Sequence, residues 1–152
     1  MTDGARSAVL TVLFDTNVIL DLVLAREPWA SDAALLLAAV ERGVVAGWMA
    51  SHAVTTVNYI VSRESGRTAA ASAVGDLLQL LMVVPLDSTD FQRALVIGLG
   101  DYEDAVQVAA CLRVGADYLV TRNARDFKGA RVEVETAGGV LAVLEARGRS
   151  QS

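Results

Sequence analysis

The sequence predicts an α/β fold, a three-layer α/β/α sandwich with a central parallel sheet of four to five strands. Nearly unbroken apolar runs such as residues 9–14 lack polar alternation, which is typical of strands covered on both faces. These runs alternate along the chain with segments of helical periodicity, and such alternation favours a parallel sheet between helices. No apolar run reaches the roughly 18 residues that a membrane span needs, so we expect no membrane-spanning helix.

The expected elements alternate from the first strand onward. Strands are expected at residues 9–14, 44–50, 82–86, 117–121 and, half exposed, 132–134. Helices are expected from about 16 to 25 and over 31–42, 51–63, 67–81, 87–99, 102–114 and 136–146. Pro85 favours an edge position for the third strand, because proline cannot donate to a strand ladder. The helices 51–63 and 67–81 are expected to form an arm beside the sheet.

Length and composition indicate one domain over residues 9–147, with a flexible N-terminus at 1–8 and a flexible tail at 148–152. The chain is 53% hydrophobic and its mean hydropathy is +0.42, which favours a buried sheet and a subunit interface. The N-terminus has no apolar core typical of a secretory signal, so we expect a cytoplasmic protein. A net charge of −5 argues against a general nucleic-acid binder, but not against an enzyme whose acids hold a metal.

Three acids that are distant in sequence are expected to meet at the carboxyl edge of the sheet. Asp15 follows the first strand. A helix that connects parallel strands begins at the carboxyl edge, so helix 102–114 brings Asp104 there in its first turn. Strand 117–121 returns to the same edge, where the following loop carries Asp126. In open α/β sheets this edge is where ligands bind.

Crowded carboxylates repel one another unless a cation balances them. Oxygen ligands without histidine or cysteine suit Mg²⁺ or Mn²⁺, which activate water and neutralise charge on a phosphate. The three acids therefore indicate metal-assisted hydrolysis of phosphodiesters. Arg122 and Arg125 flank the predicted site and are candidate phosphate contacts.

Each acid also has a structural interpretation. Asp15 or Asn17 can cap the following helix, and Asp101 with Asp104 forms a capping pattern. Asp126 can stabilise a turn in its polar loop. We expect Glu103 to be a solvated neighbour of the site rather than a ligand.

Four further side chains have a functional and a structural interpretation. A histidine at position 52 could touch a phosphate, but a surface position in the first helical turn is the favoured interpretation. Cys111 is expected to be buried and inert. Trp29 and Trp48 could stack on bases, although the strand pattern around Trp48 favours the core.

Three motifs together resemble the PIN domain, a family of metal-dependent ribonucleases that includes the VapC-type toxins of bacterial toxin–antitoxin pairs. The motifs are Phe14-Asp15-Thr16-Asn17-Val18, Asp101-Tyr102-Glu103-Asp104-Ala105 and Val120-Thr121-Arg122-Asn123-Ala124-Arg125-Asp126-Phe127. The resemblance implies a small, commonly dimeric sandwich that cuts RNA with Mg²⁺ or Mn²⁺. It implies metal-site roles for Asp15, Asp104 and Asp126. It implies supporting roles for four polar side chains, Thr16, Asn17, Thr121 and Asn123.

One position departs from the family pattern. Similar proteins carry a glutamate in the helix after the second strand, where this chain has Asn58. Glu64 lies nearly two helical turns further on, too far to replace it. The first hypothesis is a ribonuclease toxin, which we expect to be a homodimer and whose antitoxin is a separate chain. The alternative is a catalytically weak PIN-like module that binds a protein or RNA partner. A phosphatase fits less well, because no second aspartate follows two residues after Asp15.

Overall fold

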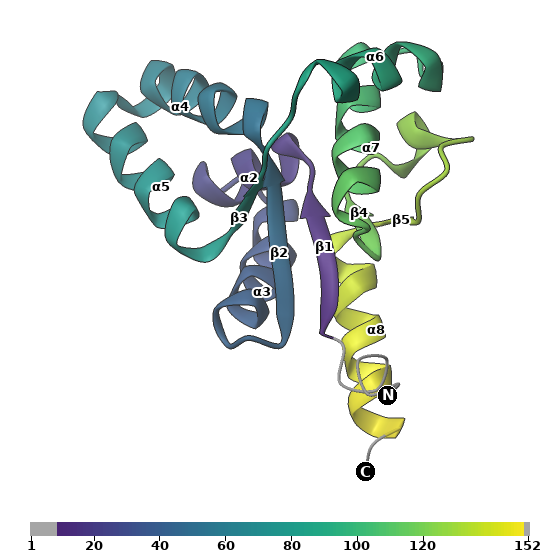
Figure 1. Ribbon diagram of the computed structural model, residues 1–152. Coiled ribbons are helices and arrows are strands. Elements are labelled where there is room, and N and C mark those ends of the chain that lie inside the picture. Colours follow the sequence, from purple (N-terminus) through teal and green to yellow (C-terminus); the bar gives the residue numbers. More distant parts are fainter. Residues whose placement is uncertain (1–8, 151–152) are drawn as a thin grey trace.

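A five-stranded parallel sheet forms the centre of the computed structural model, which describes residues 9–150 (Figure 1). The strands are β1 (Leu10–Phe14), β2 (Val45–Ala50), β3 (Met82–Val84), β4 (Tyr118–Val120) and β5 (Val134–Glu135). Their order across the sheet is β3-β2-β1-β4-β5, and every neighbouring pair is parallel. The predicted fold class is thereby confirmed. Of the predicted flexible segments, residues 1–8 and 151–152 lie outside the described residues, and residues 148–150 belong to the last helix, α8 (Ala137–Ser150).

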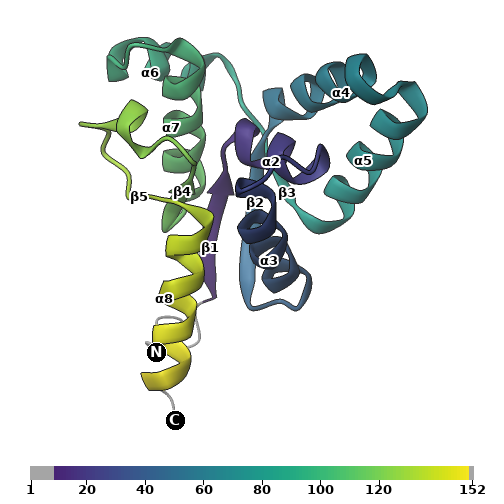
Figure 2. The ribbon, with the colours of Figure 1, turned by 180° about the vertical axis from the view of Figure 1, so that it is seen from behind.

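Helices cover both faces of the sheet (Figures 1 and 2). One face carries α2 (Thr16–Val23), α3 (Trp29–Glu41) and α8 (Ala137–Ser150). The other face carries α7 (Tyr102–Val114), against which α6 (Ser88–Ile97) packs. Within residues 9–150, the structure contains no helix with the length and apolarity needed to cross a membrane.

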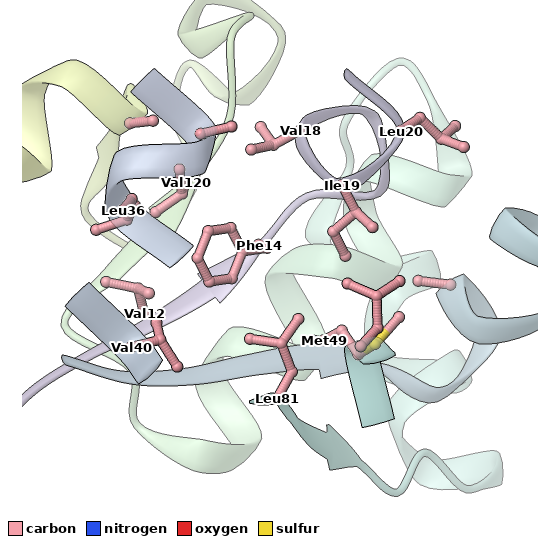
Figure 3. Close-up of a cluster of buried hydrophobic side chains, with 14 of the residues drawn as sticks. Val12, Phe14, Val18, Ile19, Leu20, Leu36, Val40, Met49, Leu81 and Val120 are labelled. Atoms are coloured by element: carbon pink, nitrogen blue, oxygen red, sulfur yellow. The ribbon is translucent and has the colours of Figure 1, made fainter. Parts of the chain in front are cut away.

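Side chains of β1 alternate between two hydrophobic clusters, as expected of a central strand. Val12 and Phe14 join the cluster under α2, α3 and α8, whereas Leu13 joins the cluster under α7. Figure 3 shows Phe14 within the first cluster, near Ile19 and Leu36. Complete burial of side chains of this size contributes about 1.5–3 kcal/mol each. Both clusters therefore hold the end of β1, and Asp15 after it, in a fixed place.

The predicted arm is formed by α4 (Ser51–Ser65) and α5 (Arg67–Leu80), which pack on one another beside the sheet (Figure 1). A single residue, Gly66, joins the two helices with φ at +94°. A side chain would be strained in this backbone region, so glycine suits the sharp turn.

Several boundaries differ from the sequence-based expectation, most of them by one or two residues; the last strand, for example, lies at Val134–Glu135 rather than at 132–134. The first helix ends at Val23 rather than near Ala25, because Ala25 has a positive φ of +54° that a helix cannot accommodate. Strand β3 stops at Val84, before Pro85, and lies at the predicted edge of the sheet. The polar loop after β4 contains a short 3-10 helix, η1 (Ala124–Phe127), and α8 continues to Ser150.

Candidate metal centre

The end of β1 lies at a point where the strand order reverses. Strands β2 and β3 extend to one side of β1, and β4 and β5 extend to the other. In open α/β sheets such a switch point leaves a crevice at the carboxyl edge. Asp15 lies there, and its backbone N–H donates to the carbonyl of Val120 at the end of β4, at 2.9 Å. The topology therefore brings β1, β4 and the residues after them to one place.

The Asp15 carboxylate faces this crevice region and does not cap α2. Asp15 occupies the N-cap position, but its side chain makes no capping hydrogen bond. Its Oδ2 instead accepts a hydrogen bond from Thr121 Oγ1 at 2.8 Å, and the N–H of Asn123 donates to that hydroxyl at 3.2 Å. The interpretation of Asp15 as a simple helix cap is therefore wrong.

Burial leaves the Asp15 carboxylate short of partners. The residue is 3% exposed, and its Oδ1 is a buried oxygen without a hydrogen-bond partner in the described chain. Burial raises the pKa of Asp15 to about 6; the Thr121 hydrogen bond opposes this rise, and the charge of Glu103 adds to it. An oxygen that lacks a donor in a buried position is suited to a cation.

The N-terminus of α7 supplies two more carboxylates. Asp101 is the N-cap, and its side chain accepts from the Asp104 N–H at 3.1 Å, so the predicted capping role of Asp101 is confirmed. The cap fixes the first turn, which carries Glu103 and Asp104. One oxygen each of Asp15, Glu103 and Asp104 lies within 4.8 Å of the others.

Electrostatic repulsion in this group is strongest at Asp104. Burial and then the charges of Asp101, Asp15, Glu103 and Asp126 raise the pKa of Asp104 to about 7. Asp15 and Asp104 thus favour the protonated form more than ordinary aspartates do. A bound cation would reverse that preference, because positive charge favours the ionised acids.

The side chain of Glu103 is 46% exposed, as expected of a solvated neighbour, but its carboxylate belongs to the group and is held by hydrogen bonds. Its Oε2 accepts from His52 Nε2 at 2.7 Å, from Gln107 Nε2 at 3.1 Å and from Thr16 Oγ1 at 3.3 Å. Burial raises the pKa of Glu103, but the hydrogen bonds from His52 and Gln107 lower it by more, and the net shift is downward. Glu103 is therefore the acid of the three that ionises most readily.

His52 also departs from its expected role. It lies in the first turn of α4, as predicted, but its side chain is only 23% exposed and contacts Glu103. The sequence analysis overlooked Gln107, which is fully buried and also donates to Thr16 Oγ1 at 2.9 Å. The available signal was a single amide within the otherwise apolar stretch Ala105–Cys111. Cys111 is buried as predicted, and burial raises the pKa of its thiol to about 12.

The remaining predicted residues lie around the group at different depths. Asp126 is exposed on η1 and outside the group of three, although its charge reaches Asp104. Asn17 and Asn123 are exposed, the former on α2 and the latter between β4 and η1. Asn58 is exposed on α4, the helix that contributes His52.

The two predicted arginines differ in their surroundings. Arg125 is exposed on η1. Arg122 is held by Asp21, a fully buried carboxylate of α2, with Nη1 and Oδ1 3.3 Å apart. Its guanidinium carbon lies 4.0 Å from the centre of the Trp29 ring. Trp48 is half-buried in β2, in keeping with the core interpretation.

The donor set fits a hard divalent cation. It consists of carboxylate oxygens, the ligands that Mg²⁺ and Mn²⁺ accept, and Asp15 contributes a buried oxygen without a partner. Thr16, Thr121 and Gln107 hold the carboxylates in position with hydrogen bonds. Such supporting contacts orient ligands before an ion binds.

A search of curated proteins gives no significant match, but solved structures share the fold. VapBC from Salmonella typhimurium bound to DNA aligns with a TM-score of 0.66 at 16% identity, covering 85% of this chain and 99% of that one. VapBC2 from Rickettsia felis, bound to a DNA fragment of its promoter, aligns at 0.64 and 14% identity, covering 84% and 98%. Mycobacterium tuberculosis VapC20, a sarcin-ricin loop cleaving toxin, aligns at 0.58 and 18% identity, covering 71% and 86%.

The sequence itself matches a family model. The model describes a PIN domain and matches residues 11–125, which include Asp15, Glu103 and Asp104. The match begins within β1 and ends in η1, so it spans the elements that bring the three carboxylates together. The chain belongs to the PIN domain family.

Proposed function

We propose that this protein is a metal-dependent endoribonuclease that hydrolyses RNA phosphodiester bonds as the VapC-like toxin of a toxin–antitoxin pair. The observation that carries the proposal is the group of Asp15, Glu103 and Asp104 at the switch point of the sheet. Family membership and the fold shared with toxins of VapBC complexes support the same activity. The antitoxin would be a separate chain, and the toxin would be a homodimer in the cytoplasm.

Mg²⁺ or Mn²⁺ is the proposed cofactor, held by Asp15 and Asp104 with Glu103, and with Asp126 at the outer side. When bound, the ion would lower the pKa of a coordinated water and stabilise negative charge on the scissile phosphate. The protein contributes the arrangement of the ligands. Thr121 orients Asp15, and Asp101 fixes the helical turn that carries Asp104.

Glu103 supports an enzyme over a catalytically weak binding module. The alternative was motivated by Asn58, an amide where similar proteins carry an acid. Glu103 provides a third carboxylate that three side chains fix in place, so the count of acids does not depend on position 58. We assign Asn58, Asn17 and Asn123 supporting polar roles at the rim, and Arg125 a phosphate contact.

The test compares metal binding and cleavage in matched variants. Asp15→Asn and Asp104→Asn each remove one charge from the site, whereas Asp117→Asn removes one at the far end of β4, where Asp117 accepts from the Thr11 N–H. We expect calorimetric Mn²⁺ binding and cleavage of a mixed RNA pool in the wild type and Asp117→Asn. Both should be lost in the two site variants while circular dichroism shows them folded.

Two results would count against the proposal. Mn²⁺ affinity that is unchanged in Asp15→Asn would place the ion elsewhere. A wild type that binds neither Mn²⁺ nor Mg²⁺ would favour the partner-binding module instead.

A further inference from the structure

A second concave site lies beside the carboxylate group, and a single residue, Thr121, contacts both. A cavity of about 300 Å³ opens between α2 and the first turns of α3 and α8, and Thr121 forms part of its wall. The same Thr121 donates to Asp15 through its hydroxyl. A substrate bound at the carboxylates therefore passes close to this cavity.

The guanidinium group of Arg122 forms part of the cavity wall, and two neighbouring side chains fix its position. It lies over the Trp29 ring and pairs with Asp21. Asp21 is fully buried, and neither of its oxygens accepts a hydrogen bond from the described residues. Arg26 approaches the same carboxylate only to 4.0 Å. A buried carboxylate of this kind requires a nearby cation, so Asp21 keeps Arg122 in the cavity wall.

Charge in the cavity excludes a simple anion. The charge of Arg122 is balanced by Asp21, and the exposed Asp32 adds a further carboxylate to the rim. A phosphate would meet Asp32 without a free cation to compensate. A cationic side chain would be attracted by Asp32 but repelled by Arg122, which lines the same wall. A neutral molecule with both hydrogen-bond donors and acceptors suits these surroundings best.

The shape of the cavity further restricts the class of ligand that it can bind. Trp29 is 45% exposed, and Pro28, Val18 and Ala137 add apolar surface around it. Aromatic rings and guanidinium planes are the surfaces on which unpaired bases stack. The volume is at the small end of the roughly 300–1,000 Å³ of ligand sites, which suits one flat ring system.

We propose that this cavity binds one unpaired base of the RNA substrate and that it favours guanine. Guanine presents the O6 carbonyl, an acceptor for the N–H groups of Arg122, beside N–H donors that the Asp32 carboxylate can accept. The ring would lie against Trp29 and Arg122. This inference rests on the proposed ribonuclease function and adds a base preference to the same site.

The experiment measures RNA binding rather than cleavage. Fluorescence anisotropy follows two labelled oligonucleotides, all-adenine and the same strand with one central guanine, in Ca²⁺ buffer with the RNA checked for integrity on a gel. We expect the wild type to bind the guanine strand roughly ten-fold more tightly, the lower end of the discrimination that a good bidentate hydrogen-bond pair gives, since adenine can stack as well as guanine.

Two variants change the cavity without removing the buried ion pair. Trp29→Ala removes the exposed ring. Gly138→Leu places a side chain in the cavity, because a Cβ at Gly138 meets only the flexible Asp32 carboxylate. Both should bind the two strands equally and keep the Mn²⁺ affinity of the wild type. Gly75→Leu in α5, where a Cβ meets nothing within 4 Å, is the matched control and should keep the preference.

The outcomes separate this inference from the proposed function. A wild type that cleaves RNA but binds both strands equally overturns the guanine pocket and leaves the ribonuclease intact. A preference that survives in Gly138→Leu also overturns the pocket. A wild type that binds neither strand overturns the guanine pocket, whereas the ribonuclease proposal is still judged by Mn²⁺ binding and by cleavage of the mixed RNA pool. Quenching of Trp29 fluorescence by an arginine-containing peptide but not by the guanine strand would assign the cavity to a protein partner.

Discussion

Asp15 shows how a single buried side chain can be kept for binding at a cost in stability. Its carboxylate has one hydroxyl donor and one oxygen without a partner. A group with these surroundings destabilises the folded protein when it is ionised and no cation is present. The energetic contribution of the residue is therefore opposite in the metal-free and metal-bound states.

Asp15→Asn should accordingly stabilise the metal-free protein. Burial raises the pKa of Asp15 to about 6, and each pKa unit corresponds to about 1.4 kcal/mol. We expect the free energy of unfolding at pH 8 in EDTA to rise by about 1–3 kcal/mol, because the amide carries no charge and still accepts from Thr121. Urea denaturation measures it. A destabilised variant would show that the carboxylate is satisfied by other contacts.

Asp104 should make the stability of the metal-free protein depend on pH. Its pKa is about 7 in the folded chain, well above that of an exposed aspartate, so the folded state binds more protons than the unfolded state between about pH 4 and 7. Stability from this group is therefore lost as the pH rises through that window. In EDTA, Asp104→Asn should melt higher than the wild type at pH 8, and the difference should be clearly smaller at pH 5 and close to zero at pH 4. Equal melting differences at all three pH values would contradict the shift.

At the scale of the elements, the first turn of helix α7 is both the capped start of the helix and the source of two carboxylates of the site. Asp101 satisfies the N–H of Asp104, and the capped turn presents Glu103 and Asp104 to the end of β1. The geometry of the site therefore depends on the cap as well as on the acids.

The caps of α7 and α6 allow a matched comparison. Asp101→Ala should cost about 1 kcal/mol of stability through loss of the N-cap and should also weaken Mn²⁺ binding. Asp87→Ala removes the capping box of α6 at a position beside Arg113 in the last turn of α7, and it should lower stability with unchanged Mn²⁺ affinity. Thermal unfolding and calorimetry give the two quantities. Equal Mn²⁺ affinities in the two variants would show that the N-cap of α7 does not contribute to metal binding.

Sequence patterns predict the helices and strands well where the hydrophobic periodicity agrees with the residues that typically begin or end such elements. The strands, the arm and the capping of α7 follow from apolar runs, glycines and an aspartate in the right place. The convergence of Asp15 and Asp104 follows from the handedness and direction of the connections. The roles of Glu103 and His52 could not be predicted, because their contact joins residues 51 positions apart and depends on how the first turns of α4 and α7 are placed in space.

At the scale of the whole molecule, the sheet and its two helical layers hold the site in place through close packing in the interior. Gly47 in β2 marks the tightest position. A Cβ there would lie 2.7 Å from Leu81, 3.0 Å from Val40 and 3.1 Å from Phe14. The strand, α3, α5 and β1 therefore meet with no room for a methyl group.

Gly47→Ala should lower the free energy of unfolding by about 1–3 kcal/mol, the usual cost of overpacking. Gly75→Ala, in a helix with open space around it, should raise stability by about 0.5–1 kcal/mol. Urea denaturation of both variants measures the difference. A neutral Gly47→Ala would mean that the surrounding side chains can move aside.

The central position of β1 also has a consequence for the time at which activity can arise during synthesis. Asp15 leaves the ribosome well before its partner Thr121 and the neighbouring strand β4, which are made more than a hundred residues later. Glu103 and Asp104 also emerge late. A nascent chain would therefore carry no assembled carboxylate group beside the translation machinery and its RNA until most of the domain had been released.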